Sequence, residues 1–205
     1  MACLKDRNFL IRKLHSLSGI IPIGFFLIEH LSVNILALQG PEAYNAVAEG
    51  MQSLPFLSVI EFFYIVLPLT FHALYGLWIV YVAQNNVLEY KYYRNWMFYL
   101  QRITALITTV FVIYHVYTTR LAKTFFGTEI NYDFIHNLLS SPAAQVFYII
   151  GLLAAVFHFT NGLWTFLISW GITVGPKSQR ISGCLCSILF IVLSIVGLVG
   201  LSALV

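Results

Sequence analysis

Charged residues are scarce in this sequence. Lys, Arg, Asp and Glu make up 9% of its 205 residues, whereas hydrophobic residues make up 60%. This imbalance and a mean hydropathy of +0.84 exclude an ordinary soluble domain. The net charge is only +3 and no RNA- or DNA-binding motif is present, so no nucleic-acid partner is expected.

Cysteine is also rare, and the sequence contains only Cys3, Cys184 and Cys186. No Cys-x-x-Cys-His sequence is present, which excludes covalent attachment of a c-type haem. Cys184 and Cys186 would point about 200° away from each other on a helix, so they cannot share one metal ion. We interpret the three cysteines as packing residues.

The sequence contains five long apolar runs. Each reaches the roughly 20 residues that a helix rising about 1.5 Å per residue needs to cross about 30 Å of hydrocarbon. Short connections predict that neighbouring helices are antiparallel. We therefore predict an all-α integral membrane bundle of five transmembrane helices, forming a single domain over residues 1–205. The helices are expected at about 14–38, 57–83, 98–122, 143–170 and 181–204.

The basic residues predict an orientation for this bundle. All except Arg120 and Lys123 precede the first run, or lie in or beside the second-to-third and fourth-to-fifth connections. Because Lys and Arg are concentrated on cytoplasmic loops, we place the N-terminus on the cytoplasmic side and the C-terminus outside.

Four histidines lie inside the apolar runs, one in each of the first four: His30, His72, His115 and His158. Two of them belong to near copies of one stretch, "FHALYGLW" and "FHFTNGLW". An ionisable side chain within a membrane is costly and usually faces the bundle interior. One such histidine alone would indicate a packing residue, but four on successive helices indicate a site that uses imidazole.

Depth in the membrane sorts these histidines into pairs. His30 and His115 lie about 24 and 26 Å from the inner ends of their helices, at about 1.5 Å per residue. His72 and His158 lie about 17 and 18 Å from those ends. We therefore predict an outer pair, His30 with His115, and an inner pair, His72 with His158.

Two neutral imidazoles without a neighbouring carboxylate or thiolate are typical axial ligands of a b-type haem, whose flat apolar ring fits between helices. Zinc favours tetrahedral coordination, usually with Cys or carboxylate ligands, and copper is a weaker alternative that stays open. The prediction is two haems b, one in each pair.

Close approach of a flat ring to a helix requires missing side chains. Gly76 and Gly162 each follow an inner-pair histidine by four residues, about 40° round the helix. Gly151 and Gly19 lie about 20° from the histidine-bearing faces of their helices. We predict that these glycines provide clearance for the haems, and helix packing through small residues is the alternative.

The carboxylates of the haems need polar partners. Arg12, His15 and Ser16, near the inner end of the first helix, are candidates for the inner haem. Gln101 lies within about 40° of the histidine-bearing face of the third helix and is a further candidate. The outer side offers only Arg120 and Lys123 to the outer haem.

Four stretches carry a resemblance to a known family. They are "RKLHSLSGIIPIGFFLIEHLSVN", "FHALYGLW", "RNWMFYLQRITALITTVFVIYHVY" and "FHFTNGLWTFLISWGITVGPKSQR". They closely resemble the cytochrome b subunit of succinate dehydrogenases and fumarate reductases of the single-anchor, di-haem type. The resemblance covers essentially the whole chain and implies a multi-pass protein of the bacterial cytoplasmic membrane.

The resemblance also implies a function. A flavoprotein and an iron–sulfur subunit would dock on the cytoplasmic face, and electrons would pass through the two haems to or from menaquinone near the outer haem. The chain would be the quinone-reactive subunit and would not be active alone. His15 and Ser16 match positions that contact the inner haem's carboxylates. Val156 replaces a glutamate that some fumarate reductases use to move protons, which puts that pathway in doubt here.

Glu61 is the candidate for proton chemistry at the quinone. It precedes His72 by eleven residues, which places it about 20° from that face and about 16 Å nearer the outer surface. Menaquinone reduction takes two protons, and a partly buried carboxylate is a suitable local donor or acceptor. The alternative is that Glu61 only bonds to a neighbouring helix. Glu29 and Glu49 are weaker candidates.

Two other functions stay open at the level of sequence. A di-haem subunit of a nitrate reductase or hydrogenase also carries histidines on several helices, but would not be expected to share "LHSLSG" and "FHFTNGLW". A haem-free transporter would use the histidines as a proton relay. The direction of catalysis and the pairing of complexes into dimers also stay open.

Overall fold

The computed structural model describes residues 2–205, with side chains from residue 8 onward. This part of the chain contains no strand, and five of its helical stretches are long and apolar enough to cross a membrane. The predicted all-α fold with five membrane spans is therefore confirmed. Spans 1 to 5 cover Asn8–Gln39, Leu57–Val82, Tyr93–Phe126, Pro142–Ser169 and Pro176–Ser202.

Several spans consist of more than one helical element. Span 1 contains α1 (Ala2–Ile20) from Asn8 onward, α2 (Pro22–Asn34) and the 3₁₀ turn η1 (Ile35–Gln39). Span 2 contains α4 (Leu57–Glu61), the π-helical turn η2 (Phe62–Val66) and α5 (Leu67–Val82). Span 3 contains α6 (Tyr93–Val116), the π-helical turn η3 (Tyr117–Leu121) and α7 (Ala122–Phe126). Spans 4 and 5 are α9 (Pro142–Ser169) and α10 (Pro176–Ser202), and α3 (Pro41–Gln52) and α8 (Tyr132–Leu138) lie in connections.

Proline and glycine fix several of these boundaries. Pro22 begins α2 and cannot donate the backbone hydrogen bond that would continue α1, so span 1 is interrupted there. Pro176 begins α10, five residues before the apolar run, because proline is favoured at the first helical position. Gly127 has φ +66° and ends α7 in the left-handed conformation that glycine adopts without steric cost.

The π-helical turn in span 2 lies immediately before Pro68. Proline within a helix would collide with the carbonyl four residues earlier, which here belongs to Tyr64 inside the turn. The wider turn accommodates this collision and leaves the span continuous. Such turns are frequent at functional sites, and a second one occurs in span 3.

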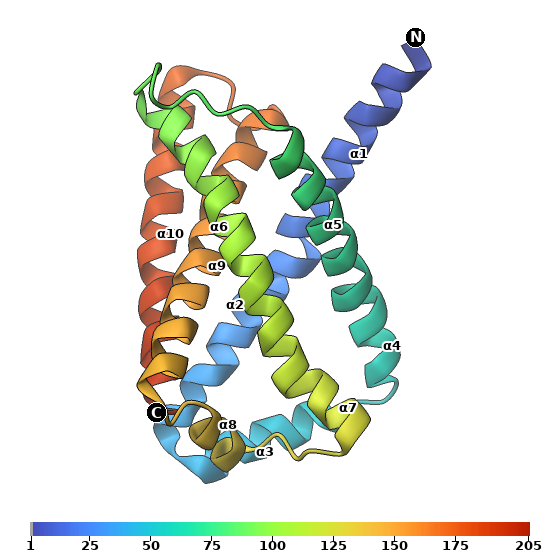
Figure 1. Cartoon of the computed structure of the whole chain (residues 1–205), viewed down its shortest axis with the longest axis vertical. Coiled ribbons are helices and arrows are strands. Elements are labelled where there is room, and N and C mark those ends of the chain that lie inside the picture. The colour runs from blue at the N-terminus through green and yellow to red at the C-terminus, as the bar shows by residue number, and fades with distance from the viewer. Residues whose placement is uncertain (1) are drawn as a thin grey trace.

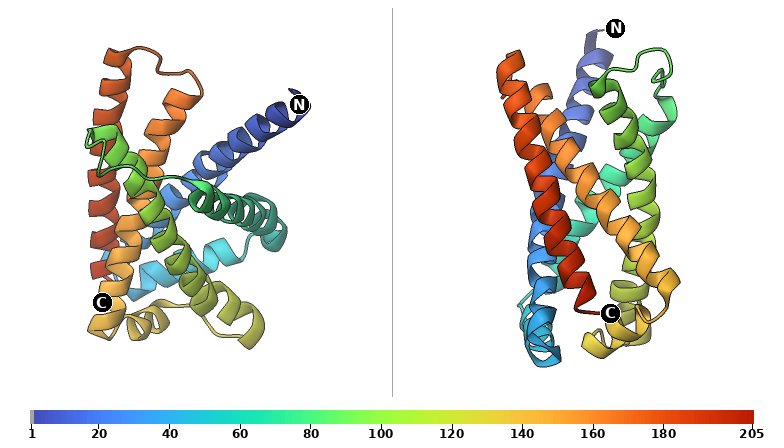
Figure 2. Two further views of the ribbon diagram at one scale, coloured as in Figure 1. Left: turned by 45° about the horizontal axis from the view of Figure 1, so that its top comes forward. Right: turned by 90° about the vertical axis from the view of Figure 1, so that its left-hand side faces the viewer.

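Helix α9 is the centre of the bundle. It packs most extensively against α6 and α10, and it also contacts α1, while α1 packs on α5 and α10 on α2. Figure 2 shows α9 and α10 side by side along their length. One buried cluster lies where α2, α9 and α10 meet and contains Leu31, Val156 and Leu193. A second cluster lies towards the opposite end from the N-terminus and contains Ala37, Ile135, Leu139, Tyr148 and Leu204.

The two ends of the bundle differ in what connects the spans. The N-terminus, the α5–α6 connection and the α9–α10 connection lie together at one end, called here the N-terminal end (Figure 1). The short helices α3 and α8 and the C-terminus lie at the other end, called here the C-terminal end (Figure 1). The N-terminal end therefore carries the basic residues that precede span 1. It also carries those in the connection between spans 2 and 3 and in the connection between spans 4 and 5.

Replacing Gly24 with Ala is expected to destabilise the bundle. A Cβ at Gly24 would lie 2.3 Å from Cε2 of Phe159, so the α2–α9 contact would have to separate. Overpacking of this kind costs about 1–3 kcal/mol, and the melting temperature of the purified protein should fall. Gly50→Ala is the control, because a Cβ there meets nothing within 4 Å. Equal melting temperatures for both variants would contradict this account.

Candidate functional site

The four histidines of the apolar runs come together in two pairs inside the bundle. The ring centroids of His72 on α5 and His158 on α9 are 6.1 Å apart, with an angle of 86° between the rings. The ring centroids of His30 on α2 and His115 on α6 are 5.8 Å apart, with an angle of 73°. These are the two pairs that the depths of the histidines along their helices predicted.

The spacing within each pair suits a shared metal ion. Two imidazoles that bind one metal through bonds of about 2 Å place their ring centroids roughly 6 Å apart. Among the described residues, no group of three or more His, Cys, Asp or Glu side chains is arranged to hold a metal ion. This donor set matches axial ligation by two imidazoles better than a tetrahedral zinc site.

Hydrogen bonds fix the tautomers of the inner pair. Nδ1 of His72 lies 2.9 Å from the backbone oxygen of His15, and Nδ1 of His158 lies 3.1 Å from that of Gln101. A carbonyl oxygen can only accept, so the proton of each ring is on Nδ1. Nε2 of each ring therefore keeps its lone pair, which is the state required of a metal ligand.

Aromatic side chains surround the outer pair. The ring of Phe26 stacks on His30 at 5.5 Å between centroids, and that of Phe111 stacks on His115 at 5.7 Å. Nδ1 of His115 lies 3.5 Å from the hydroxyl oxygen of the buried Tyr148. The outer imidazoles are thus held by ring contacts and one phenol, whereas the inner imidazoles are held by backbone carbonyls.

The glycines singled out in the sequence allow rings and amides to approach the helices. A Cβ at Gly19 would lie 2.3 Å from Cε1 of His72, and one at Gly151 would lie 2.2 Å from the ring of Phe111. A Cβ at Gly76 would lie 3.1 Å from Nε2 of His15. At Gly162 the corresponding distance, to Nε2 of Gln101, is 3.3 Å. Each of these glycines therefore faces a side chain of the protein.

The candidates for carboxylate contacts have different surroundings. His15 stacks on His72 with 4.2 Å between centroids, and its Nε2 is buried without a hydrogen-bond partner among the described residues. Ser16 donates to the backbone oxygen of Lys13 and accepts from Nε1 of Trp170 at 3.0 Å. Arg12 is exposed. Of these three, His15 has the side-chain atom that most requires a further polar partner.

Gln101 is already bonded within the protein. Its amide nitrogen donates to the backbone oxygen of His158 at 2.9 Å, and its amide oxygen accepts from Asn161 at 2.6 Å. Asn161 also donates to the backbone oxygen of Met97 at 3.1 Å. These bonds join α6 to α9 beside the inner pair, so Gln101 has a structural role that the sequence prediction did not include.

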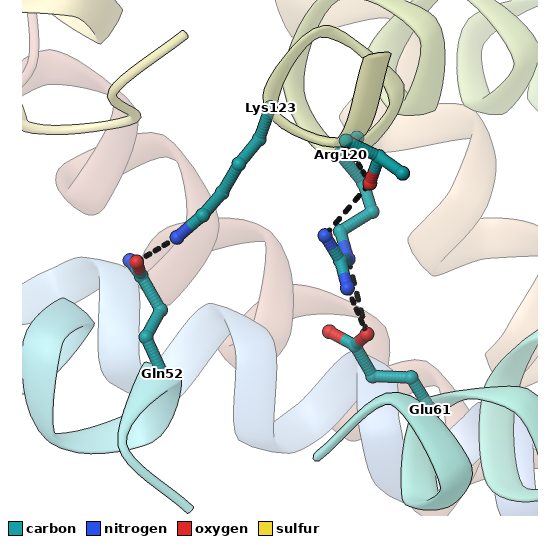
Figure 3. A network of polar contacts seen from close by, with 5 residues as sticks. Gln52, Glu61, Arg120 and Lys123 are labelled. Atoms are coloured by element: carbon teal, nitrogen blue, oxygen red, sulfur yellow. Dashed lines mark hydrogen bonds and ion pairs between the residues drawn. The ribbon is translucent and has the colours of Figure 1, made fainter. Parts of the chain in front are cut away.

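Glu61 forms an ion pair with Arg120 at the C-terminal end. Its Oε2 accepts from Nε of Arg120 at 3.0 Å and from Nη2 at 2.5 Å (Figure 3). Arg120 also donates to the hydroxyl of Thr124 at 2.9 Å, and Lys123 donates to Gln52 of α3. The carboxylate lies next to η2 and the guanidinium lies within η3, so this pair joins the two π-helical turns.

Comparison with known proteins assigns the family. Residues 83–199, more than half of the chain, match the family described as succinate dehydrogenase/fumarate reductase transmembrane subunit. A relative, the succinate dehydrogenase cytochrome b558 subunit of Bacillus subtilis (strain 168), is 52% identical over 200 residues, covering 98% of both chains. The chain belongs to this family of transmembrane subunits. The resemblance to the cytochrome b subunit of succinate dehydrogenases and fumarate reductases is therefore confirmed, and this subunit is an integral membrane component of an oxidoreductase complex.

Val156 of the transmembrane subunit lies in an apolar environment. Its side chain is 0% exposed and packs with Leu31 and Leu193. Val156 is therefore part of the hydrophobic core.

Three contacts of the transmembrane subunit's site were missed by sequence reasoning: those made by Tyr148, Asn161 and Arg120. Asn161 is a buried polar residue within the repeated "FHFTNGLW", and a polar side chain inside a membrane span is itself a signal of a buried contact. Tyr148 carries no comparable signal, because tyrosine is common in membrane spans and near their ends.

Proposed function

We propose that this subunit binds two haems b and passes electrons between an iron–sulfur subunit and menaquinone. The observation that carries the proposal is the meeting of four imidazoles in two pairs, 6.1 and 5.8 Å apart. The relative's name, cytochrome b558, supports haem b as the bound group. When bound, each haem supplies reversible one-electron transfer. The family match favours this function over the nitrate reductase, hydrogenase and transporter alternatives.

The histidines would hold the irons of the two haems. His72 and His158 are assigned to the inner haem and His30 and His115 to the outer haem. The Nδ1 bonds of the inner pair support the first assignment, since they leave both Nε2 atoms free to bind metal. The buried and unpartnered Nε2 of His15 supports a contact with a carboxylate of the inner haem.

The N-terminal end of the bundle is proposed as the cytoplasmic docking face for the iron–sulfur and flavoprotein subunits. Among the residues from 8 onward, five basic residues at this end are exposed, and such a surface favours association with acidic partner surfaces. Arg102 does not contribute, because it is buried and donates to Asn85. The exposed residues are Arg12, Lys91, Arg94, Lys177 and Arg180.

The C-terminal end is proposed as the menaquinone side, with Glu61 in proton chemistry. The side chain of Glu61 is 24% exposed, so it is accessible from the surface while bound to Arg120. A carboxyl group at such a position can deliver a proton in its protonated form as the quinone is reduced, or accept one as a carboxylate when the quinol is oxidised. Its partner Arg120 also holds the carboxylate in a fixed orientation.

A haem assay of the purified complex tests the proposed function. We expect the reduced pyridine haemochrome to give two haems b per chain of this subunit. We also expect succinate-linked reduction of a menaquinone analogue by the complex, which contains the flavoprotein and the iron–sulfur subunit. Fewer than two haems per chain would contradict the assignment of both histidine pairs.

A further inference from the structure

The inner site is built from two equivalent halves. Nδ1 of His72 bonds to the backbone oxygen of the residue 57 positions earlier, His15, and Nδ1 of His158 bonds to that of Gln101 at the same 57-residue separation. The near copies "FHALYGLW" and "FHFTNGLW" contain these two histidines. Thus α1 with α5 forms one half, and α6 with α9 forms the other.

The glycines of the two copies extend this equivalence. Gly76 follows His72 by one helical turn and faces the side chain of residue 15, while Gly162 follows His158 by one turn and faces that of residue 101. The two Cβ distances, 3.1 and 3.3 Å, are nearly equal. In each half, therefore, the glycine makes room for the side chain whose own backbone carbonyl fixes the histidine.

We propose that residues 15 and 101 are equivalent positioning residues, and that Gln101 sets the orientation and ligand strength of His158 at the inner haem. This inference rests on the proposed haem site. Gln101 positions His158 through three hydrogen bonds. The backbone carbonyl of Gln101 accepts from the His158 ring, and its side-chain amide nitrogen donates to the backbone oxygen of His158. Its side-chain amide oxygen accepts from Asn161. Together these bonds fix α6 against α9 at the depth of the ring.

The bond to Nδ1 has a chemical consequence for the metal. A carbonyl that accepts from Nδ1–H makes the imidazole a stronger electron donor, which stabilises the oxidised iron. Loosening this bond should therefore raise the reduction potential of the inner haem and leave the outer haem unchanged. The outer haem serves as an internal reference, because no bond of Gln101 reaches His30 or His115.

The test compares Gln101→Leu with Gln101→His in the assembled complex, by redox titration and by electron paramagnetic resonance of the oxidised haems. Leu has a similar size but loses both side-chain bonds. We expect the inner component of Gln101→Leu to shift to higher potential, by about a tenfold change in the equilibrium constant, or about 59 mV for one electron. Its resonance signal should shift as well.

Gln101→His tests the equivalence of the halves, because it places the residue of the first half into the second. We expect its inner potential to stay closer to the wild type than that of Gln101→Leu. If both variants shift equally, the equivalence is wrong. If neither shifts, Gln101 does not position His158.

Gln145→Leu is the matched control. Gln145 lies on α9, the helix that carries His158, and like Gln101 it donates to a backbone oxygen, that of Leu139 at 3.0 Å, but far from the inner pair. An equal effect of this control on the inner haem would indicate general loosening of α9 and would overturn the proposal. His158→Ala separates failure of the positioning role of Gln101 from failure of the proposed haem site. If the inner haem persists in His158→Ala, the proposed haem ligand itself is wrong.

Discussion

Replacing His158 with Ala is expected to abolish the inner haem while the outer haem remains. The two pairs share no residue, so loss of the His158 imidazole should leave the pair of His30 and His115 intact. Redox titration of the variant should lack one of two components, and the pyridine haemochrome should fall from two haems per chain to one. The inner component is expected to be lost because both imidazoles of the pair would hold its iron, and the variant retains only that of His72.

His30→Ala should remove the other component. The comparison of the two variants is decisive because the same missing component in both would refute the pairing. Loss of both haems together with the partner subunits would instead indicate collapse of the bundle. His136→Ala is the control, since His136 is an exposed residue of α8 and should leave both components unchanged.

The number of spans could be predicted from the sequence because hydrocarbon thickness sets a length that each apolar run must reach. Their interior geometry could not. Hydropathy does not register the interruption at Pro22 or the two π-helical turns, since both changes leave the apolar character of a span unaltered. It also placed the start of span 5 at the first apolar residues, whereas α10 begins at Pro176 and includes a polar first turn.

The pairing of the histidine rings followed from depth, because antiparallel helices with known ends need only their rise per residue to align in height. The contact partners of Gln101 and Glu61 could not be predicted from depth or from angles around a helix. Angles around one helix say which residues share a face, but they do not say which neighbouring helix that face meets. Gln101 was expected at a haem carboxylate and is bonded to His158 and Asn161. Glu61 was expected to face inward at the level of the outer haem, with a bond to a neighbouring helix as the alternative, and it is paired with Arg120 of span 3.

The ion pair changes how the role of Glu61 must be tested. Glu61→Gln removes the titrating group, but it also weakens the tie to Arg120 between the two π-helical turns. Arg120→Gln breaks the same tie and leaves the carboxylate in place. The two variants together separate proton chemistry from a purely structural bond between spans 2 and 3.

Glu61→Gln is expected to lower quinone-linked turnover by roughly 100-fold, the range for loss of a general acid or base, while both haems and succinate oxidation with an artificial dye persist. Arg120→Gln should retain much more quinone-linked turnover, because its carboxylate still exchanges protons. Glu42→Gln is the control, since Glu42 is an exposed residue in the first turn of α3. Equal losses of quinone-linked turnover in Glu61→Gln and Arg120→Gln would show that only the ion pair between these residues matters. Wild-type turnover of Glu61→Gln at every value between about pH 6 and 9 would remove Glu61 from the proton chemistry.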